Sequence, residues 1–394
     1  MKYDKSSIDS IVDFSKLLVG KSLAESVNLP SDVLERDHRG DLGTMVETYF
    51  FEHNPPNNHE PDFAEAGLEL KTTGVLRGGK SKSGYKPKER LVLSMINFNE
   101  IVNQTWETSP VYTKCKKILL LCYLFEKDKK PVDRKFVLDP LLLDFETNLA
   151  EDMAQLENDW NLIKSKVMEG RAHELSEGDT EYLGACTKAS SASDRTSQPY
   201  SSIPAKPRAF SLKMGFLRSV IELSTNEVAS VRATADQSIE EAIQNKLNTF
   251  KDMTVDEISR KLGFQKKGPS HKGFYRELAN RMMTGYNKSP EELVKSGTTI
   301  KTVRLEKSGV PKESMSFPAF RYLDIVDEFW EESSFAESLE GKFLFIVFKK
   351  DNEGELRFEK ASYWSMPYED RMSAKQVWEE TQLRTQMGVY KYPG

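Results

Sequence analysis

The chain has 394 residues, enough for two domains of ordinary size, and 38% of them are hydrophobic and 30% charged, with a net charge of −5. No apolar run approaches a membrane span, and the N-terminus has neither a signal-peptide nor a transit-peptide pattern. Three cysteines, an odd number without metal-site spacing, favour free thiols and exclude a zinc site of the usual kind. We therefore expect a cytoplasmic protein with no membrane partner.

Helices are predicted in the N-terminal part of the chain. Apolar residues recur at helical spacing over 7–28, and Gly40-Asp-Leu-Gly43 precedes an apolar helix predicted over 44–51. Glu47 is embedded in that helix. A carboxylate on an apolar helix is costly to bury unless it is paired or faces a metal, so Glu47 either faces solvent or belongs to a site.

The stretch 61–73, PDFAEAGLELKTT, is the centre of the sequence argument. Two leucines alternate with Glu69 and Lys71, which predicts a strand that buries the leucines and directs the carboxylate and the ammonium together to the other face. Gly67 supplies a turn that would bring Asp62 back beside Glu69. Two carboxylates sharing a divalent cation, with a lysine beside them, suit phosphodiester hydrolysis.

This pattern is not specific by itself. A second E-x-K, Glu340-Gly-Lys342, follows Asp324 and Asp327. The charged edge of an ordinary strand would show the same sequence pattern.

The rest of the first half predicts a mixed set of strands and helices. In chain order these are a strand over 91–98, the motif TWETS at 105–109, Lys114 before a buried run at 118–125, a long helical stretch over 140–169, a loop region over 176–205, and a strand and helix over 210–223.

Basic residues gather in two places despite the negative net charge. Residues 71–90 carry seven Lys/Arg and one acid, and residues 185–218 carry six and one. A solvated loop and a surface that contacts phosphates are both open readings of the first cluster.

Beyond a polar linker at 223–237 the chain repeats itself weakly and in order. KERLVLSMINFNEI followed by TWETS recurs as KESMSFPAFRYLDI followed by FWEESS, and KKILLLCYLFEKD recurs as KFLFIVFKKD. Trp160 corresponds to Trp378. A helix-turn-helix over 254–283 is the competing interpretation of part of this region.

The second copy has lost the chemistry. In this register Glu47 corresponds to Asn280, Asp62 falls near Glu292, and Glu69 corresponds to Thr299. Lys71 corresponds to Lys301, and Lys114 has no clear counterpart. The second copy, 238–394, looks incomplete at its end when compared with residues 171–222.

Taken together, the motifs G40-x-x-G43-x-x-x-E47, D62-x6-E69-L-K71 and W106-E-T-S-x-V-x-x-K114 resemble the MutH-like endonucleases. The segments 172–193 and 205–213 add to the resemblance, which is to the two-copy branch of type II restriction endonucleases that cut at GATC. It implies an α/β fold with a mixed sheet, the restriction-endonuclease-like PD-(D/E)XK core, duplicated as a catalytic domain (1–222) and a degenerate DNA-binding or allosteric domain (238–394).

The resemblance also implies site residues. Asp62, Glu69 and the carbonyl of Leu70 would bind Mg²⁺, for which Mn²⁺ would substitute, and Lys71 would orient or deprotonate the attacking water. Glu47 would support the metal or the lysines, and Lys114 would be a further catalytic lysine. No nucleotide cofactor is implied.

Recognition of double-stranded DNA would come from five residues of two segments: Thr187, Lys188, Arg208, Ser211 and Lys213. Cys186 and Ser211 stand where the mismatch-repair branch has an arginine and a tyrosine, so the base contacts are altered. His173 also lies in a matched motif, where a hydrogen-bonded structural histidine is expected.

The resulting expectation is a Mg²⁺-dependent type II restriction endonuclease that cuts 5′ of G in 5′-GATC-3′ and leaves 5′ overhangs. Cutting both strands would need dimerisation or two-site binding. A mismatch-repair-type nicking enzyme and a catalytically weak DNA-binding regulator are the alternatives.

Overall fold

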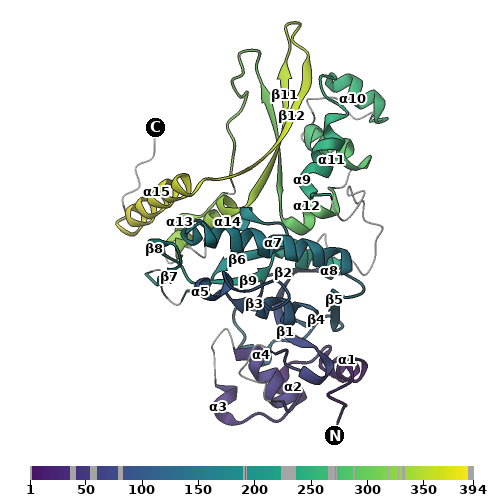
Figure 1. The fold of residues 1–394 in the computed structure, drawn as a ribbon, viewed down its shortest axis with the longest axis vertical. Helices are drawn as coiled ribbons and strands as arrows, with labels where there is room; N and C mark the ends of the chain where they lie inside the picture. Colours follow the sequence, from purple (N-terminus) through teal and green to yellow (C-terminus); the bar gives the residue numbers. More distant parts are fainter. Residues whose placement is uncertain are drawn as a thin grey trace.

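The computed structural model describes residues 2–35, 41–53, 60–78, 83–189, 191, 193–222, 237–264, 271, 273–286, 289–317, 319–326, 328–330 and 333–388. The elements follow one long axis, with the N-terminal helices at one end and a long hairpin at the other (Figure 1). Gly40 and residues 223–236 of the predicted linker lie outside the described residues.

The N-terminal end is built of short helices. They are α1 (Ile8–Ser15), η1 (Lys16–Leu18), α2 (Leu23–Ser26), α3 (Ser31–Leu34), α4 (Asp41–Met45), the π-helix η2 (Val46–Phe50) and η3 (Ala64–Ala66). Their apolar faces form a core with one face of the first sheet, in which Ile11, Phe51 and Leu70 are buried. The predicted helix over 44–51 is therefore present, with its second half wound as a π-helix.

The first sheet carries the motif residues. Its strands, in the order β2-β1-β4-β5, are β1 (Glu69–Arg77), β2 (Tyr85–Pro87), β4 (Lys117–Leu124) and β5 (Leu141–Asp144). β1 and β4 are parallel, with Glu69 opposite Ile118, and β2 and β5 are antiparallel edges. β4 is covered on both faces, which explains its nearly continuous apolar sequence.

The middle of the molecule holds a second sheet and its covering helices. The elements are β3 (Leu91–Met95), α5 (Phe98–Ile101), α6 (Pro110–Cys115), η4 (Pro131–Asp133), α7 (Ala150–Met168), η5 (Ala172–Glu174), η6 (Glu177–Asp179), β6 (Leu183–Thr187), β7 (Thr196–Gln198), β8 (Ser201–Ala205), β9 (Arg208–Leu212) and α8 (Met214–Glu222). β9 lies between β3 and β6 and is antiparallel to both. This part, with everything before it, is called the first unit.

Three predictions in this region were wrong in detail. The stretch 140–169 begins as strand β5 because its leucines pair with β4, and only then becomes helix α7. The predicted loop 176–205 contains β6, β7 and β8, whose backbone hydrogen bonds to partner strands compensate for a Gly/Ser/Thr-rich sequence. The strand over 91–98 ends at Met95, and α5 follows.

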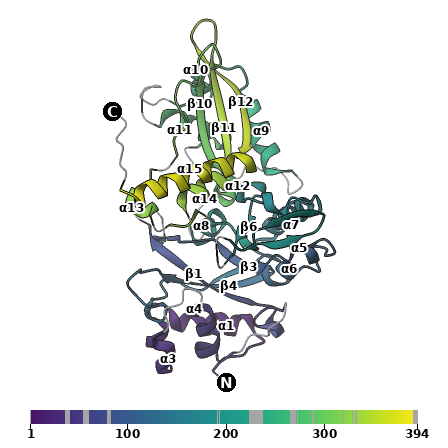
Figure 2. The same ribbon diagram turned by 90° about the vertical axis from the view of Figure 1, so that its left-hand side faces the viewer.

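The second unit, residues 237–388, has the same kind of elements. They are α9 (Ile239–Asn248), α10 (Val255–Lys261), α11 (Phe274–Thr284), α12 (Glu291–Ser296), β10 (Thr299–Leu305), α13 (Tyr322–Ile325), α14 (Ser334–Glu340), β11 (Lys342–Lys350), β12 (Leu356–Ser365) and α15 (Tyr368–Gln386). β10 and β11 are parallel and β12 is antiparallel to β11. Helices α9–α12 flank the sheet on one side, while α15 crosses near its base (Figures 1 and 2).

The two units share one hydrophobic core. A single buried cluster runs from Val75 in β1 to Phe358 in β12. Helix α8 packs on α12 so closely that a Cβ at Gly215 would lie 2.2 Å from the carbonyl oxygen of Val294, so glycine is required there.

Buried ionic contacts accompany this packing. Lys295 Nζ lies 2.8 Å from both carboxylate oxygens of Asp152, and Lys342 bonds to Glu181. The second unit is therefore docked firmly on the first.

The fold is thus a mixed α/β fold with mixed sheets, as expected. Among the described residues, no helix is both long and apolar enough to cross a membrane. The three cysteines are free and buried.

Candidate active site

A tight reversal of the chain brings Asp62 to Glu69. Phe63 and Leu68 exchange backbone hydrogen bonds of 2.9 and 3.2 Å around η3, and Gly67 occupies the left-handed region with φ 63°. Asp62 Oδ2 accepts the Leu70 N–H at 2.9 Å, and the Asp62 N–H donates to Glu69 Oε2 at 3.3 Å. The turn predicted from Gly67 is therefore present, and it holds the two carboxylates side by side.

Two lysines converge on Glu69. Lys71 Nζ lies 2.5 Å and Lys114 Nζ 3.1 Å from the same oxygen, Glu69 Oε1. Lys71 follows Glu69 in β1 and Lys114 comes from α6, which Ser109 caps by accepting the Tyr112 N–H. Glu69 is fully buried, whereas the side chains of Lys71 and Lys114 keep 22% and 18% of their exposure. The lysines therefore face the solvent side of the site.

Glu47 completes the group from the π-helix η2. Burial raises the pKa of Glu47 to about 7, and the charges of Asp62 and Glu69 add to that rise. Burial and then the charge of Glu69 also raise the pKa of Asp62, although Lys71 opposes the shift. Three carboxylates thus share two lysines, and their negative charge is not fully compensated.

This donor set fits a divalent cation. Carboxylate oxygens from Asp62 and Glu69, with the main chain of Leu70 between them, are the hard oxygen ligands that Mg²⁺ prefers. A bound cation would neutralise the excess negative charge that the raised carboxyl pKa values indicate. Among the described residues, no three His, Cys, Asp or Glu side chains form a ready-made metal cluster, so the set depends on the two carboxylates and a carbonyl.

His53 is a neighbour of the site that sequence reasoning missed. Its Nε2 contacts the carbonyl oxygen of Asp62, and its ring stacks on Phe63 with centroids 5.0 Å apart. Glu52, with φ 49°, makes the reversal that places His53 there. The sequence around it carries no motif that would have indicated this position.

The predicted DNA-recognition residues divide into two groups. Thr187 is half-buried at the end of β6 and Lys188 is exposed, with its N–H bonded to the carbonyl of Pro207. Arg208, Ser211 and Lys213 are buried in or beside β9. A base contact by any of these three would require a rearrangement of their surroundings.

The bonds of the buried basic residues explain their positions. Arg208 Nη1 donates to the Ala185 carbonyl at 2.6 Å. Lys213 Nζ donates to the carbonyls of Glu177 and Thr180 at 2.5 and 2.6 Å, and burial lowers its pKa. Lys213 thus holds the segment that leads into β6.

A second anchor of that segment is Asp159 of α7, which sequence reasoning also missed. Its carboxylate accepts the N–H groups of Glu181, Tyr182 and Leu183 at 2.6–2.9 Å. Burial raises the pKa of Asp159 to about 6.

His173 has the structural role expected for it. Its Nδ1 lies 3.0 Å from Gln198 Nε2, and its ring meets Tyr368 of the second unit edge to face.

The first basic cluster, residues 71–90, is only partly described by the structure. Its Lys80 and Lys82 lie outside the described residues. Arg90 pairs with Glu177, and Lys88 lies over the ring of Phe125.

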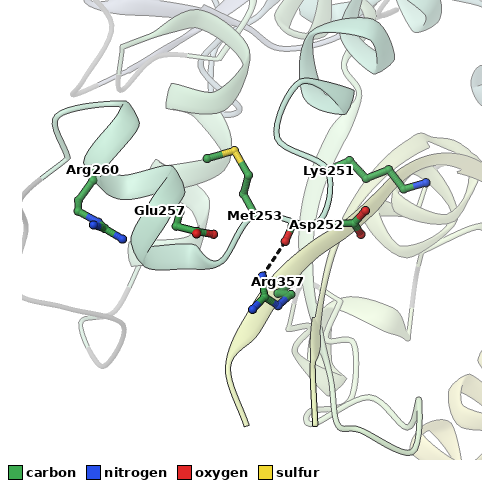
Figure 3. Close-up of a pocket in the computed structure, with 6 residues that line it drawn as sticks. All are labelled: Lys251, Asp252, Met253, Glu257, Arg260 and Arg357. Carbon is green, nitrogen blue, oxygen red and sulfur yellow. Dashed lines mark hydrogen bonds between the residues drawn. The ribbon is translucent and has the colours of Figure 1, made fainter. Parts of the chain in front are cut away.

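The second unit has a surface hollow of its own (Figure 3). Lys251, Asp252, Met253, Glu257, Arg260 and Arg357 line it. Its charged groups serve the local structure, since Arg357 binds Asp351 and the Asp252 carbonyl while Glu257 caps α10 through Thr254. The hollow does not reproduce the carboxylate–lysine arrangement of Glu69.

Comparison with known proteins agrees with the site. Residues 51–159 match the family described as "DNA mismatch repair enzyme MutH". The chain is 34% identical over 400 residues to the type II restriction enzyme Sau3AI of Staphylococcus aureus, covering 95% of this chain and 79% of that protein. It is 26% identical over 224 residues to the DNA mismatch repair protein MutH of Actinobacillus pleuropneumoniae, covering 55% of this chain and 93% of that protein.

Proposed function

Because the chain belongs to the MutH-like endonuclease family, with the type II restriction enzyme Sau3AI among its relatives, we propose that it is a type II restriction endonuclease that hydrolyses both strands of DNA at 5′-GATC-3′. The expected cut lies 5′ of G and leaves a 5′ overhang. The observation that carries the proposal is the convergence of Lys71 and Lys114 on Glu69 beside Asp62.

The proposed roles are those that the resemblance implies, and the geometry of the site supports them. Asp62, Glu69 and the carbonyl of Leu70 would hold Mg²⁺, which when bound would acidify water and neutralise charge at the phosphate. Lys71 would orient the attacking water or accept its proton. Lys114, which enters from α6, would offset negative charge as the phosphodiester is attacked.

Glu47 would act through these groups. The charges of Asp62, Glu69 and both lysines act on the pKa of Glu47. Protonation or ionisation of Glu47 therefore changes the net charge of the site. We assign it to supporting the metal or the lysines.

Thr187, Lys188, Arg208, Ser211 and Lys213 remain the proposed DNA-recognition residues. Thr187 and Lys188 are accessible and suit direct contact in the major groove. Arg208, Ser211 and Lys213, as placed here, would act by shaping the strand that carries the contacts, or after rearrangement.

We further propose that the second unit, within residues 238–394, is a degenerate copy of the first. Thr299 pairs with Phe343 in β10–β11 as Glu69 pairs with Ile118 in β1–β4. Gly297 stands two residues before Thr299 with φ 70°, as Gly67 stands before Glu69 with φ 63°.

A second stretch supports the duplication. Ser333 caps α14 and donates to the Trp330 carbonyl, as Ser109 caps α6 and donates to that of Trp106. The tryptophans pack on Trp378 and Trp160, with centroids 5.8 and 6.1 Å apart. Helices α10 and α11, which the helix-turn-helix interpretation also covers, belong to this proposed second copy.

The described residues of that copy keep only part of the catalytic set. Lys301, at the position of Lys71, donates to the Ser316 carbonyl, and Thr299 replaces Glu69. The second unit would therefore serve DNA binding or allostery, and cutting of both strands would require two chains or two binding events.

The test is digestion of DNA with one unmethylated GATC site, in Mg²⁺, followed by mapping of both cut ends. The proposal predicts linear product with a four-base 5′ overhang. A product nicked in one strand only, or cleavage confined to hemimethylated GATC, would favour the mismatch-repair-type nicking enzyme. Binding without cleavage would favour the DNA-binding regulator.

A further inference from the structure

A small cavity lies between the two units, away from the carboxylate–lysine site. Helix α15 presents one face to it, with Tyr368, Arg371, Met372 and Lys375 at positions i, i+3, i+4 and i+7. The first unit supplies Arg208 at the start of β9 and other residues from the end of β6 and the strands near it. Both units are needed to form its walls.

The cavity is strongly cationic. Five basic residues line it and Glu340 is the one acid among the lining residues: the basic residues are Arg195, Lys206, Arg208, Arg371 and Lys375. Arg208 and Arg371 are buried, and enclosing two guanidinium groups is costly without an anion to balance them.

Two guanidinium groups in this wall keep an unsatisfied donor. Arg371 is 5% and Arg208 4% exposed, and each donates one bond to a carbonyl, to Glu174 at 2.7 Å and to Ala185 at 2.6 Å. Within the described residues, Arg371 Nη1 and Arg208 Nε have no acceptor. A buried donor left without an acceptor is rare and costs about 1–3 kcal/mol, so these two donors favour binding of an acceptor from outside the chain.

The electrostatic environment of Arg371 also favours an anion in this cavity. Burial, and then the positive charge of Arg208, lower the pKa of Arg371, while Glu340 and Asp179 oppose the shift. The two guanidinium groups thus repel each other across a space that the nearby acids compensate only in part. An anion between them would reverse that repulsion.

The space has room for such an anion. Its volume is about 80 Å³, whereas one buried water needs roughly 10–15 Å³. Trp330, Ala336 and Leu339 form an apolar part of the lining, which lowers the local dielectric and strengthens any ion pair made there.

We infer that this cavity is a phosphate-class oxyanion site, in which Arg208 of the first unit and Arg371 of the second bind one anion between them. Planar guanidinium groups suit phosphate oxygens, which accept several charge-assisted hydrogen bonds at once. The anion links the two units at the strands that carry Thr187 and Arg208. A free phosphate and a phosphodiester of DNA share this chemistry.

The first measurement uses the full chain without divalent metal, so that the result does not depend on cleavage. Inorganic phosphate is titrated by calorimetry at constant ionic strength, and thermal unfolding is followed with phosphate or chloride. The wild type should bind phosphate and unfold at a higher temperature in it. Arg371→Met should weaken binding at least tenfold, whereas Arg384→Met, an exposed arginine on the same helix, should bind as the wild type does.

A second variant protects the test against misfolding of Arg371→Met. Glu340→Gln removes the acid that lines the cavity and should tighten phosphate binding several-fold. Equal phosphate binding in the wild type, Arg371→Met and Glu340→Gln would overturn the inference, as would a wild type that phosphate neither binds nor stabilises.

The source of the anion is then separated by competition. A DNA duplex without GATC that displaces phosphate from the wild type identifies a backbone phosphodiester as the occupant. A duplex that binds without displacing phosphate identifies the free anion. Either outcome supports the site, and neither depends on the nuclease proposal.

Discussion

Replacement of Lys295 by methionine tests how the two units are held together. Lys295 Nζ lies 2.8 Å from both Asp152 oxygens and 3.0 Å from Glu291, and the side chains of Lys295 and Asp152 are 9% and 10% exposed. Methionine keeps the apolar stem and removes the charge. Because Asp152 would then stay buried without its cation, we expect the free energy of unfolding to fall by about 3–5 kcal/mol near pH 8.

The stability difference between the wild type and Lys295→Met should also depend on pH, in a direction that the pKa of Asp152 determines. Burial raises the pKa of Asp152 even with Lys295 present, so the protonated carboxyl is favoured more in the folded state than in the unfolded chain. The stability that belongs to a raised carboxyl pKa is present at low pH and is lost as the pH rises through the folded-state value. Loss of Lys295 raises that pKa further, so the difference between wild type and variant should shrink from pH 8 to pH 5.

The assay is urea unfolding followed by tryptophan fluorescence at both pH values. Arg384→Met removes an exposed pair with Glu380 and should cost no more than about 1 kcal/mol. The double variant Asp152→Asn/Lys295→Met should recover most of the loss. A Lys295→Met cost as small as that of the control, or one that does not change with pH, would refute the reasoning.

Three further outcomes are expected. Asp159→Asn should cost about 2–4 kcal/mol in urea unfolding, because an amide nitrogen would face backbone N–H donors that the carboxylate now accepts; an unchanged midpoint would contradict this. Lys114→Met should lower the cleavage rate roughly 10²–10³-fold with little change in DNA affinity by gel shift, and a pure affinity loss would make it a DNA-binding residue instead. Since the pKa of Glu47 is raised to about 7, a divalent cation that lowers it should release protons on binding near pH 7, and calorimetry in buffers of different ionisation enthalpy should find fewer released in Glu47→Gln.

The local part of the site could be predicted from sequence. Alternation in β1 gives the pairing of Glu69 with Lys71, and Gly67 gives the reversal that returns Asp62, because both depend on neighbours within a few residues. One feature was misjudged, since Glu69 is fully buried rather than directed to the surface. There it pairs with Lys114, which is 45 residues away and lies just before β4, the parallel partner of β1.

The recognition segment shows where sequence reasoning reaches its limit. Lys213 and Arg208 are basic residues of the kind expected on a DNA-contacting surface. Both, however, donate to backbone carbonyls inside the protein. Nothing near them in the sequence indicates that Thr180 or Ala185 would supply those carbonyls. Strands β6 to β8 were missed for a related reason, since their small polar residues are held by strand pairing, of β6 with β9 and of β7 with β8, and carry no apolar alternation that would predict a strand.

The most direct test of the central claim compares equivalent positions of the two units. Asp62 stands seven residues before Glu69, as Glu292 stands seven before Thr299. Asp62→Asn and Glu292→Gln are assayed with Mg²⁺ on a plasmid carrying unmethylated GATC sites, after both variants are shown to fold. The account predicts that Asp62→Asn loses cleavage while Glu292→Gln still yields discrete fragments at GATC. Full cleavage by Asp62→Asn, or loss of cleavage in folded Glu292→Gln alone, would contradict it.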